Sequence, residues 1–327
     1  MYRVDIREFL ESAPDHGFPL DYLLSRLRGR KSRLVTDWDM LMKSTSPVGQ
    51  LPPGHYQMIF GIGSPDAVWR ALMAEYRWAY HQMNGQGRKT FAPFFLYGEL
   101  RTLFIGLRYL KGLMRDRLQE ILSLSLLSGE IRDILLKSPD ALSAARKIEE
   151  KFLGLSGRFR GIAGPIQHEG LKGFEQKLAE LFLQVIITTR LDPVLKTFFL
   201  QVIDARNILA LAKLLKQGET LEHPFISGSR IHAATLREIL ERRDMQAAVT
   251  LVSRFTGEKT GVAELSGLEP SLYRRISRTL KKEGRTSLGT GPVLYYLWRC
   301  SVEAMNLSIL SYGAQLTHDI VAAELVR

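Results

Sequence analysis

The stretch ELRTLFIGLRYL, residues 99–110, decides the fold class of this 327-residue chain. Its apolar side chains recur at intervals of three, one, three and three, which is the pattern of one face of an α-helix. These residues are Leu100, Leu103, Phe104, Leu107 and Leu110. Similar stripes predict helices over residues 66–83, 118–136, 141–153, 174–188, 198–212, 235–255, 270–282 and 294–309. No stretch alternates like a strand between hairpin turns, so we predict an all-α protein.

Three stretches rich in glycine or proline interrupt these helices. Residues 44–65 carry four prolines and predict an extended loop. Residues 154–173 hold six glycines, too many for one undisturbed helix, and residues 284–292 predict a short connector. None of them is long enough to predict a linker between independent domains.

An internal repeat is visible in three of the predicted helices. Each carries an acid followed three residues later by Thr or Asn, in the pairs Glu99 and Thr102, Asp204 and Asn207, and Glu303 and Asn306. The acids lie 105 and then 99 residues apart, from 99 to 204 and from 204 to 303. Each helix opens near a proline and ends near a glycine, as helix termini favour. We predict three similar helical subdomains, residues 1–115, 116–218 and 219–327, arranged around a pseudo-threefold axis.

The three recurrent acids favour a structural role over a catalytic one. Acid–base catalysis would need two of them facing each other near a pocket. One acid at the same place in each repeat instead predicts pairing with a local arginine or capping of a neighbouring helix. Thr102, Asn207 and Asn306 share the helix face of the acids, so we expect them to bridge to a neighbouring backbone.

No pattern of catalytic, metal-binding or cofactor-binding residues stands out. The seven histidines are scattered, and no HExxH or similar ligand spacing occurs. Gly61-Ile62-Gly63 and Gly85-Gln86-Gly87 lack the third glycine and the P-loop lysine that nucleotide binding requires. The single cysteine, Cys300, lies inside a predicted helix, where a core position is the expected role. We therefore expect no catalytic site, no metal and no cofactor.

Composition is that of a globular protein, with 45% hydrophobic residues. One cysteine excludes a disulfide framework and fits a reducing compartment. The N-terminal residues lack the apolar core of a signal peptide, and no apolar run approaches the ~20 residues of a membrane-spanning helix.

The chain is strongly basic, with Lys+Arg 45 against Asp+Glu 34 and a formal net charge of +11. Part of this charge falls in two clusters, which are candidate docking surfaces for an acidic partner. The first is Arg26, Arg28, Arg30, Lys31 and Arg33, and the second is Arg274, Arg275, Arg278, Lys281 and Lys282. A solvated helix face and an anionic lipid surface are the alternatives. Nucleic-acid binding remains the runner-up function, although no helix-turn-helix, zinc finger or aromatic RNA-binding pattern accompanies the clusters.

Three parts of the chain resemble the C subunit of prokaryotic V/A-type rotary ATPases, the counterpart of the d subunit of eukaryotic V-ATPases. The C-terminal run from Gly291-Pro292 through Tyr295-Tyr296 to Glu303-Ala304-Met305-Asn306-Leu307 is similar to the closing helix of that family. Asp204-Ala205-Arg206-Asn207-Ile208 resembles its middle repeat. The opening helix is similar at Tyr22, Arg26, Arg28, Lys31, Ser32 and Leu34. The chain departs from the family pattern at Thr102, Ser308 and Gly313-Ala314.

The resemblance implies a fold and a function. Members of that family form a funnel of three helical subdomains on the cytoplasmic face of the membrane, bound peripherally. The funnel joins the central shaft to the membrane rotor ring and so couples ATP turnover to proton or sodium transport. The resemblance implies a non-catalytic protein, present as a single copy per complex and monomeric when isolated, with no nucleic acid as partner.

Overall fold

The computed structural model describes residues 5–43, 65–218, 225–259, 261, 267–286, 288–312 and 317–327. These residues are predominantly helical, and no β-strand forms among them apart from one isolated bridge between Leu10 and Leu127. The all-α prediction is confirmed. Residues 44–64 of the loop predicted over residues 44–65, including Gly61-Ile62-Gly63, lie outside the described residues, as does Gly313-Ala314. Pro65, the last residue of that predicted loop, is instead the first residue of a helix.

The chain divides into two compact units, each of which contains its own core. Unit 1 comprises residues 1–23 and 73–191, and unit 2 comprises residues 24–72 and 192–327. Both units therefore combine an N-terminal piece with a later stretch of the chain. The division into three subdomains stays a prediction.

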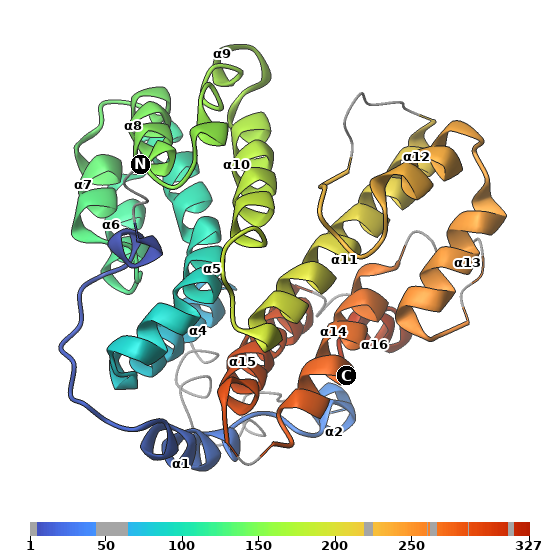
Figure 1. Cartoon of the computed structure of the whole chain (residues 1–327), viewed down its shortest axis with the longest axis horizontal. Helices are drawn as coiled ribbons and strands as arrows, with labels where there is room; N and C mark the ends of the chain where they lie inside the picture. The colour runs from blue at the N-terminus through green and yellow to red at the C-terminus, as the bar shows by residue number, and fades with distance from the viewer. Residues whose placement is uncertain are drawn as a thin grey trace. The chain divides into compact units, whose positions relative to one another are not determined.

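Unit 1 is built around one long helix, α5. Its elements are η1 (Ile6–Phe9), the second half of α4 (Pro65–Gln82), α5 (Gly85–Lys111), α6 (Arg115–Ser123), α7 (Gly129–Lys137), α8 (Ala141–Leu153), η3 (Gly157–Phe159), α9 (Ile166–Glu169) and α10 (Leu171–Ile186). Helices α6, α7, α8 and α10 all pack against α5 (Figure 1). The apolar stripe that defines the fold faces this core, since Leu100, Leu103, Leu107 and Leu110 are all buried.

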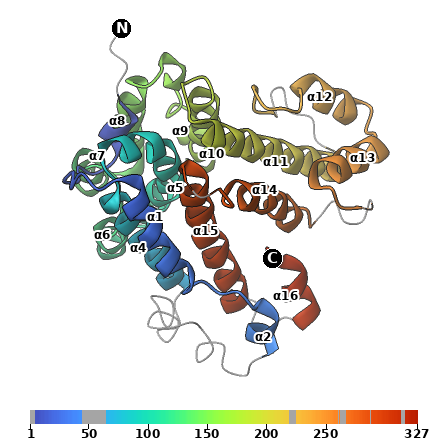
Figure 2. The ribbon, with the colours of Figure 1, turned by 60° about the horizontal axis from the view of Figure 1, so that its bottom comes forward.

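Unit 2 contains two long helices, α11 and α15. Its elements are the end of α1 (Leu20–Lys31), α2 (Trp38–Lys43), the first half of α4, α11 (Pro193–Gln217), α12 (Ala233–Glu241), α13 (Met245–Thr256), α14 (Glu269–Glu283), α15 (Thr290–Tyr312) and α16 (His318–Glu324). Helix α14 packs against both α11 and α15, and α16 packs against α14 and α15 (Figure 2).

Helices α8 and α13 share a capping residue and a pattern of burial. An aspartate caps each of them: Asp140 accepts the N–H of Ser143 at 2.8 Å, and Asp244 accepts that of Ala247 at 2.8 Å. Counted from each cap, the residues four, five, eight and twelve positions later are all buried. They are Ala144, Ala145, Ile148 and Phe152 in α8, and Ala248, Val249, Val252 and Thr256 in α13.

Candidate functional site

The marker pairs lie on the three long helices and are buried. Exposed fractions are 1% for Glu99, 3% for Thr102, 1% for Asp204 and 2% for Glu303. Asn207 and Asn306 are exposed by 1% and 0%. Buried polar groups must be hydrogen-bonded if the fold is to be stable, so their partners reveal their role.

Glu99 of α5 holds the turn that leads into α7. One carboxylate oxygen accepts the backbone N–H of Leu126 at 2.5 Å, and the other accepts the hydroxyl of Ser125 at 2.8 Å. The carbonyl of Leu126 in turn accepts the N–H of Glu11 at 2.7 Å. Burial raises the pKa of Glu99, and the hydrogen bonds oppose this shift. The hydroxyl of Thr102 lies 3.8 Å from the sulfur of Met73, and its hydrogen bond with Glu99 is one of those that oppose the pKa shift. Within the described residues it forms no bridge to a neighbouring backbone.

Asp204 and Asn207 of α11 hold the segment that leads into α12. Asp204 accepts the N–H of Ile231 at 3.0 Å. Asn207 accepts the N–H of Ile226 at 2.8 Å and donates to the carbonyl of the same residue at 2.9 Å. The amide side chain thus pairs with a backbone amide as a strand neighbour would. Burial raises the pKa of Asp204.

Glu303 and Asn306 of α15 hold segments from both ends of the sequence. Glu303 accepts the N–H of Val35 at 2.5 Å, and Arg299 donates to the carbonyl of Val35 at 3.0 Å. Asn306 accepts the N–H of Val326 at 2.9 Å and donates to its carbonyl at 2.9 Å. The side chain of Arg327 then reaches Asp39 in α2 at 2.8 Å.

The first two acids bind backbone N–H groups at the same sequence separation. Glu99 and Leu126 are 27 residues apart, and so are Asp204 and Ile231. Leu126 lies three residues before α7 and Ile231 two residues before α12. The third acid, Glu303, instead binds a segment that precedes it in the sequence by 268 residues.

Val35 supplies the equivalent segment for Glu303. It lies three residues before α2, as Leu126 lies before α7. A side-chain cap begins both helices: Asp37 accepts the N–H of Met40 at 2.8 Å, and Ser128 accepts that of Ile131 at 3.4 Å. The segment before α2 is therefore bound by Glu303 of α15 as the segment before α7 is bound by Glu99 of α5. Both views show α2 next to α16 (Figures 1 and 2).

Two arginines of the second basic cluster, Arg274 and Arg278, make contacts within the protein. Arg274 lies 3.4 Å from Glu258 and donates to the carbonyl of Leu325 at 3.3 Å. Arg278 pairs with Glu258 at 3.2 Å and donates to the carbonyl of Thr256. These two arginines tie α14 to the end of α13 and to the C-terminal residues.

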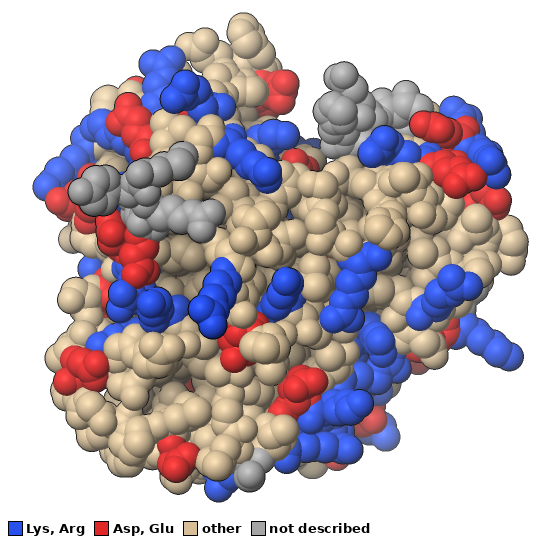
Figure 3. All heavy atoms as spheres, viewed as in Figure 1, with Lys and Arg blue, Asp and Glu red and all other residues tan. Residues whose placement is uncertain are grey.

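The structure brings the end of α14, which carries Lys281 and Lys282, close to Lys31 of the first cluster. The ammonium of Lys31, at the end of α1, lies 5.3 Å from the centre of the Tyr295 ring. The same ring packs on Gly284, where an added Cβ would lie 2.6 Å from Tyr295 Cδ1. Gly284 directly follows α14, and Lys281 and Lys282 near the end of that helix are exposed. In Figure 3, Lys and Arg gather in the part of the view where Figure 1 draws α14.

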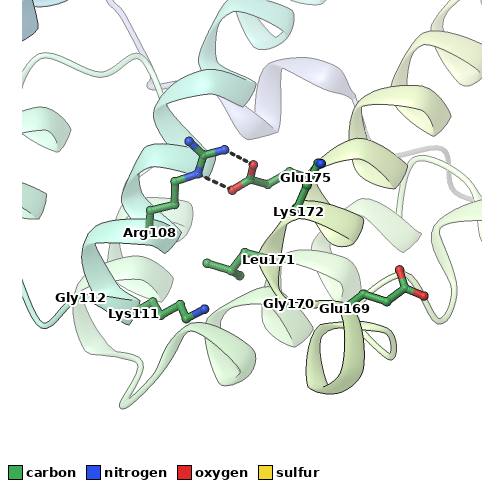
Figure 4. A pocket seen from close by; sticks show the side chains of 8 residues that line it. All are labelled: Arg108, Lys111, Gly112, Glu169, Gly170, Leu171, Lys172 and Glu175. Carbon is green, nitrogen blue, oxygen red and sulfur yellow. Dashed lines mark hydrogen bonds and ion pairs between the residues drawn. The ribbon is translucent and has the colours of Figure 1, made fainter. Parts of the chain in front are cut away.

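A shallow pocket of about 630 Å³ lies in unit 1, between the end of α5 and the start of α10 (Figure 4). Arg108 and the buried Glu175 face each other there, with Arg108 Nε donating at 2.8 Å and a second bond from the same guanidinium. The hydrogen bond to Glu175 raises the pKa of Arg108. This ion pair joins the two helices, and Glu169 points away from it.

Metal ligands and membrane-spanning helices would each indicate another kind of site. In the described part of the chain, no three His, Cys, Asp or Glu side chains gather in a way that could hold a metal ion. Among the described helices, none combines the length and the apolar character needed to cross a bilayer.

The geometry defines an all-α protein in which buried acids and amides on the long helices form hydrogen bonds with the backbone of neighbouring segments. The sequence profile of the ATP synthase (C/AC39) subunit matches residues 63–319. The chain belongs to that family, a family of V-type ATPase and ATP synthase subunits, and the resemblance drawn from the sequence is confirmed. No curated protein matches the chain in sequence.

Sequence reasoning located the six marker residues and missed what Glu303 binds. The local signal existed: Val35-Thr36-Asp37 before α2 has the same order as Leu126-Leu127-Ser128 before α7, an apolar residue followed two positions later by a capping residue. Nothing in the spacing indicated that a segment near the N-terminus pairs with a helix near the C-terminus. The two ion-pair centres at Glu11 and Glu175 carried no sequence signal, because their partners lie 66 and 67 residues away.

Proposed function

We propose that this chain is a non-catalytic component of the central stalk that couples the central shaft of a V/A-type ATPase to its membrane rotor ring. The observation that carries the proposal is the family match over residues 63–319. The markers support it, since each buried acid on a long helix serves to hold a backbone segment.

Transmission of torque requires a body that resists deformation between two contact surfaces. Helices α5, α11 and α15 each carry a buried polar residue that fixes the entry to a neighbouring short helix. A buried group that loses its partner costs about 1–3 kcal/mol, so bending a long helix away from its neighbour is opposed at each of these points. Packed interiors are also only weakly compressible.

The proposal includes the finer arrangement that the resemblance implies. Three similar subdomains would surround an opening that receives the foot of the shaft, on the cytoplasmic face of the membrane. The protein would bind peripherally, in a single copy per complex, and would be a monomer when isolated.

Co-purification tests this function. The chain, the shaft subunits and the ring are expressed together, and the complex is isolated through a tag on the ring. We expect the shaft to co-purify with the ring only when this chain is present. Binding of the shaft to the ring without the chain, or failure of the chain to bind either partner, would contradict the proposal.

The runner-up, nucleic-acid binding, rests on the net charge of +11. Two of the arginines that suggested it, Arg274 and Arg278, are engaged within the protein. A titration with duplex DNA and single-stranded RNA at several salt concentrations decides between the two functions. Tight binding with a steep log–log salt slope would favour the runner-up.

A further inference from the structure

Five cations remain at one end of unit 2 after the internal contacts are assigned. Lys281 and Lys282 lie near the end of α14, Arg285 follows it, and Lys31 and Arg33 lie at and after the end of α1. All five are exposed, and within the described residues none of them forms an ion pair with a carboxylate. We call these five residues the basic end.

The basic end is a single surface because Tyr295 connects its two parts. The ammonium of Lys31 from α1 lies over its ring, and the turn at Gly284 packs against the same side chain. The turn itself is close-packed, since a Cβ on Gly291 would lie 2.5 Å from the carbonyl oxygen of Glu283. The position of the cations is therefore set by backbone packing. Leu288, in the same turn, is 61% exposed and adds an apolar contact beside them.

A concentration of like charge of this kind is unfavourable in the isolated protein and favourable in a complex with an acidic surface. Lysine presents a strongly hydrated point charge that suits scattered carboxylates. The one aromatic ring described here, that of Tyr295, is 8% exposed and already packs against Lys31 and Gly284, so it offers little surface for the base stacking that single-stranded nucleic-acid sites use. These features favour an acidic protein surface as the partner.

Membrane electrostatics indicates which partner lies there. The cytoplasmic leaflet carries a negative surface potential, which attracts basic surfaces by about 1 kcal/mol per Lys or Arg near it. A protein with one strongly basic end is therefore most stable with that end toward the membrane. Under the proposed function, the partner on that side is the rotor ring.

We propose that the basic end docks against acidic residues on the cytoplasmic surface of the membrane rotor ring. The inference rests on the proposed function and deepens it by assigning one surface to one partner. It also divides the second sequence cluster into two roles: Arg274 and Arg278 stabilise the fold, and Lys281 and Lys282 bind the ring.

The test compares two charge-reversal variants of the full chain. The first carries Lys281→Glu, Lys282→Glu and Arg285→Glu. The second, a matched control, carries Arg146→Glu, Lys147→Glu and Lys172→Glu, three exposed cations of unit 1. Both change the net charge by the same amount. Circular dichroism and thermal unfolding verify that both variants fold, and binding to detergent-solubilised ring is measured at low and high salt.

We expect the first variant to bind the ring at least about tenfold more weakly than wild type at low salt, with a much flatter salt dependence. The control should bind like wild type. Equal loss in both variants would show a general charge effect and overturn the proposal. Equal binding by wild type and the first variant would overturn the surface assignment and leave the proposed function intact. Failure of the wild-type chain to bind the ring would instead contradict the proposed function.

Two further arms distinguish other partners. The first variant is tested against the isolated shaft subunits, and a loss of shaft binding with intact ring binding would overturn the proposal. It is also tested by sedimentation with phosphatidylcholine vesicles containing about 30% phosphatidylserine. A loss of vesicle binding with intact ring binding would make the basic end a lipid-binding surface, again overturning the proposal.

Discussion

Glu303 accepts the backbone N–H of Val35 at 2.5 Å, across 268 residues of sequence. The carboxylate is 2% exposed and lies on the last long helix of the chain. Val35 occupies the place that Leu126 and Ile231 occupy relative to Glu99 and Asp204. Helix α15 thus binds a segment from each end of the sequence, around Val35 and around Val326. The hydrogen bond from Arg327 to Asp39 links these two segments to each other.

Replacement of Glu303 tests this link. Glu303→Ala leaves the buried N–H of Val35 without its acceptor, so we expect the free energy of unfolding to fall by about 1–3 kcal/mol. Hydrogen exchange should show faster exchange over residues 34–43 than in wild type, with little change around α7 and α12. The control, Glu324→Ala, removes an exposed acid of α16. Unchanged exchange over residues 34–43 would show that Glu303 does not hold this segment.

Asn207 and Asn306 should each require an amide. Asn306→Asp replaces the donor to the carbonyl of Val326 by a second acceptor, which introduces repulsion in a buried site. We expect a loss of about 2 kcal/mol in urea unfolding, and a similar loss for Asn207→Asp. Gln246→Glu makes the same chemical change at an exposed position of α13 and should have almost no effect. Comparable stability of all three variants would contradict the assigned roles.

Glu11 is the centre of an ion-pair cluster in unit 1. It accepts two bonds from Arg77, at 2.7 and 2.9 Å, and lies 2.6 Å from His81 and 3.6 Å from Arg132. Glu11→Ala leaves Arg77, Arg132 and the ring nitrogen of His81 without their shared partner, and we expect a loss of about 2 kcal/mol. Glu150→Ala, at an exposed acid of α8 in the same unit, is the control. If both variants unfold at the same urea concentration, the cluster contributes nothing to the stability of unit 1.

The buried acids Glu99 of α5 and Asp204 of α11 should make the free energy of unfolding fall as the pH rises. Burial raises the pKa of Glu99 and of Asp204, so each binds protons more tightly in the folded chain than in the unfolded one. Between the ordinary and the raised pKa the folded state holds more protons, and the free energy of unfolding therefore decreases as pH rises.

Glu99→Gln should flatten this decrease, measured by urea unfolding from about pH 5 to about pH 8. Asp140→Asn is the control. The hydrogen bond from the N–H of Ser143 lowers the pKa of Asp140, so the stability that this acid contributes is lost only as the pH falls below its ordinary pKa. A decrease of the same size in wild type and Glu99→Gln would show that Glu99 contributes no such proton linkage.

Sequence periodicity was sufficient for the stripe from Leu100 to Leu110 because it is a local property of one helix. It did not find every break between helices: the helix predicted over residues 118–136 divides into α6 and α7, and the one predicted over residues 235–255 divides into α12 and α13. The marker acids were recognised because they recur. Thr102 shows the limit of that reasoning, since it shares the position of Asn207 and Asn306 and does not bridge to the backbone.

Contacts between distant segments could not be read in this way. The pairing of Val35 with Glu303 depends on the path of the whole chain. The division of the basic cluster on α14 depends on Glu258, which lies 16 residues before Arg274 and 20 before Arg278. Burial and pairing, which decide whether a cation is available to a partner, are properties of the folded state.

Reconstitution of the complete complex tests the central claim most directly. The ATPase head with its shaft and the ring are assembled in vesicles with and without this chain, and ATP hydrolysis and ion uptake are measured together. We predict that hydrolysis persists without the chain and that ATP-driven ion uptake requires it. Ion uptake at the full rate in its absence would contradict a coupling role.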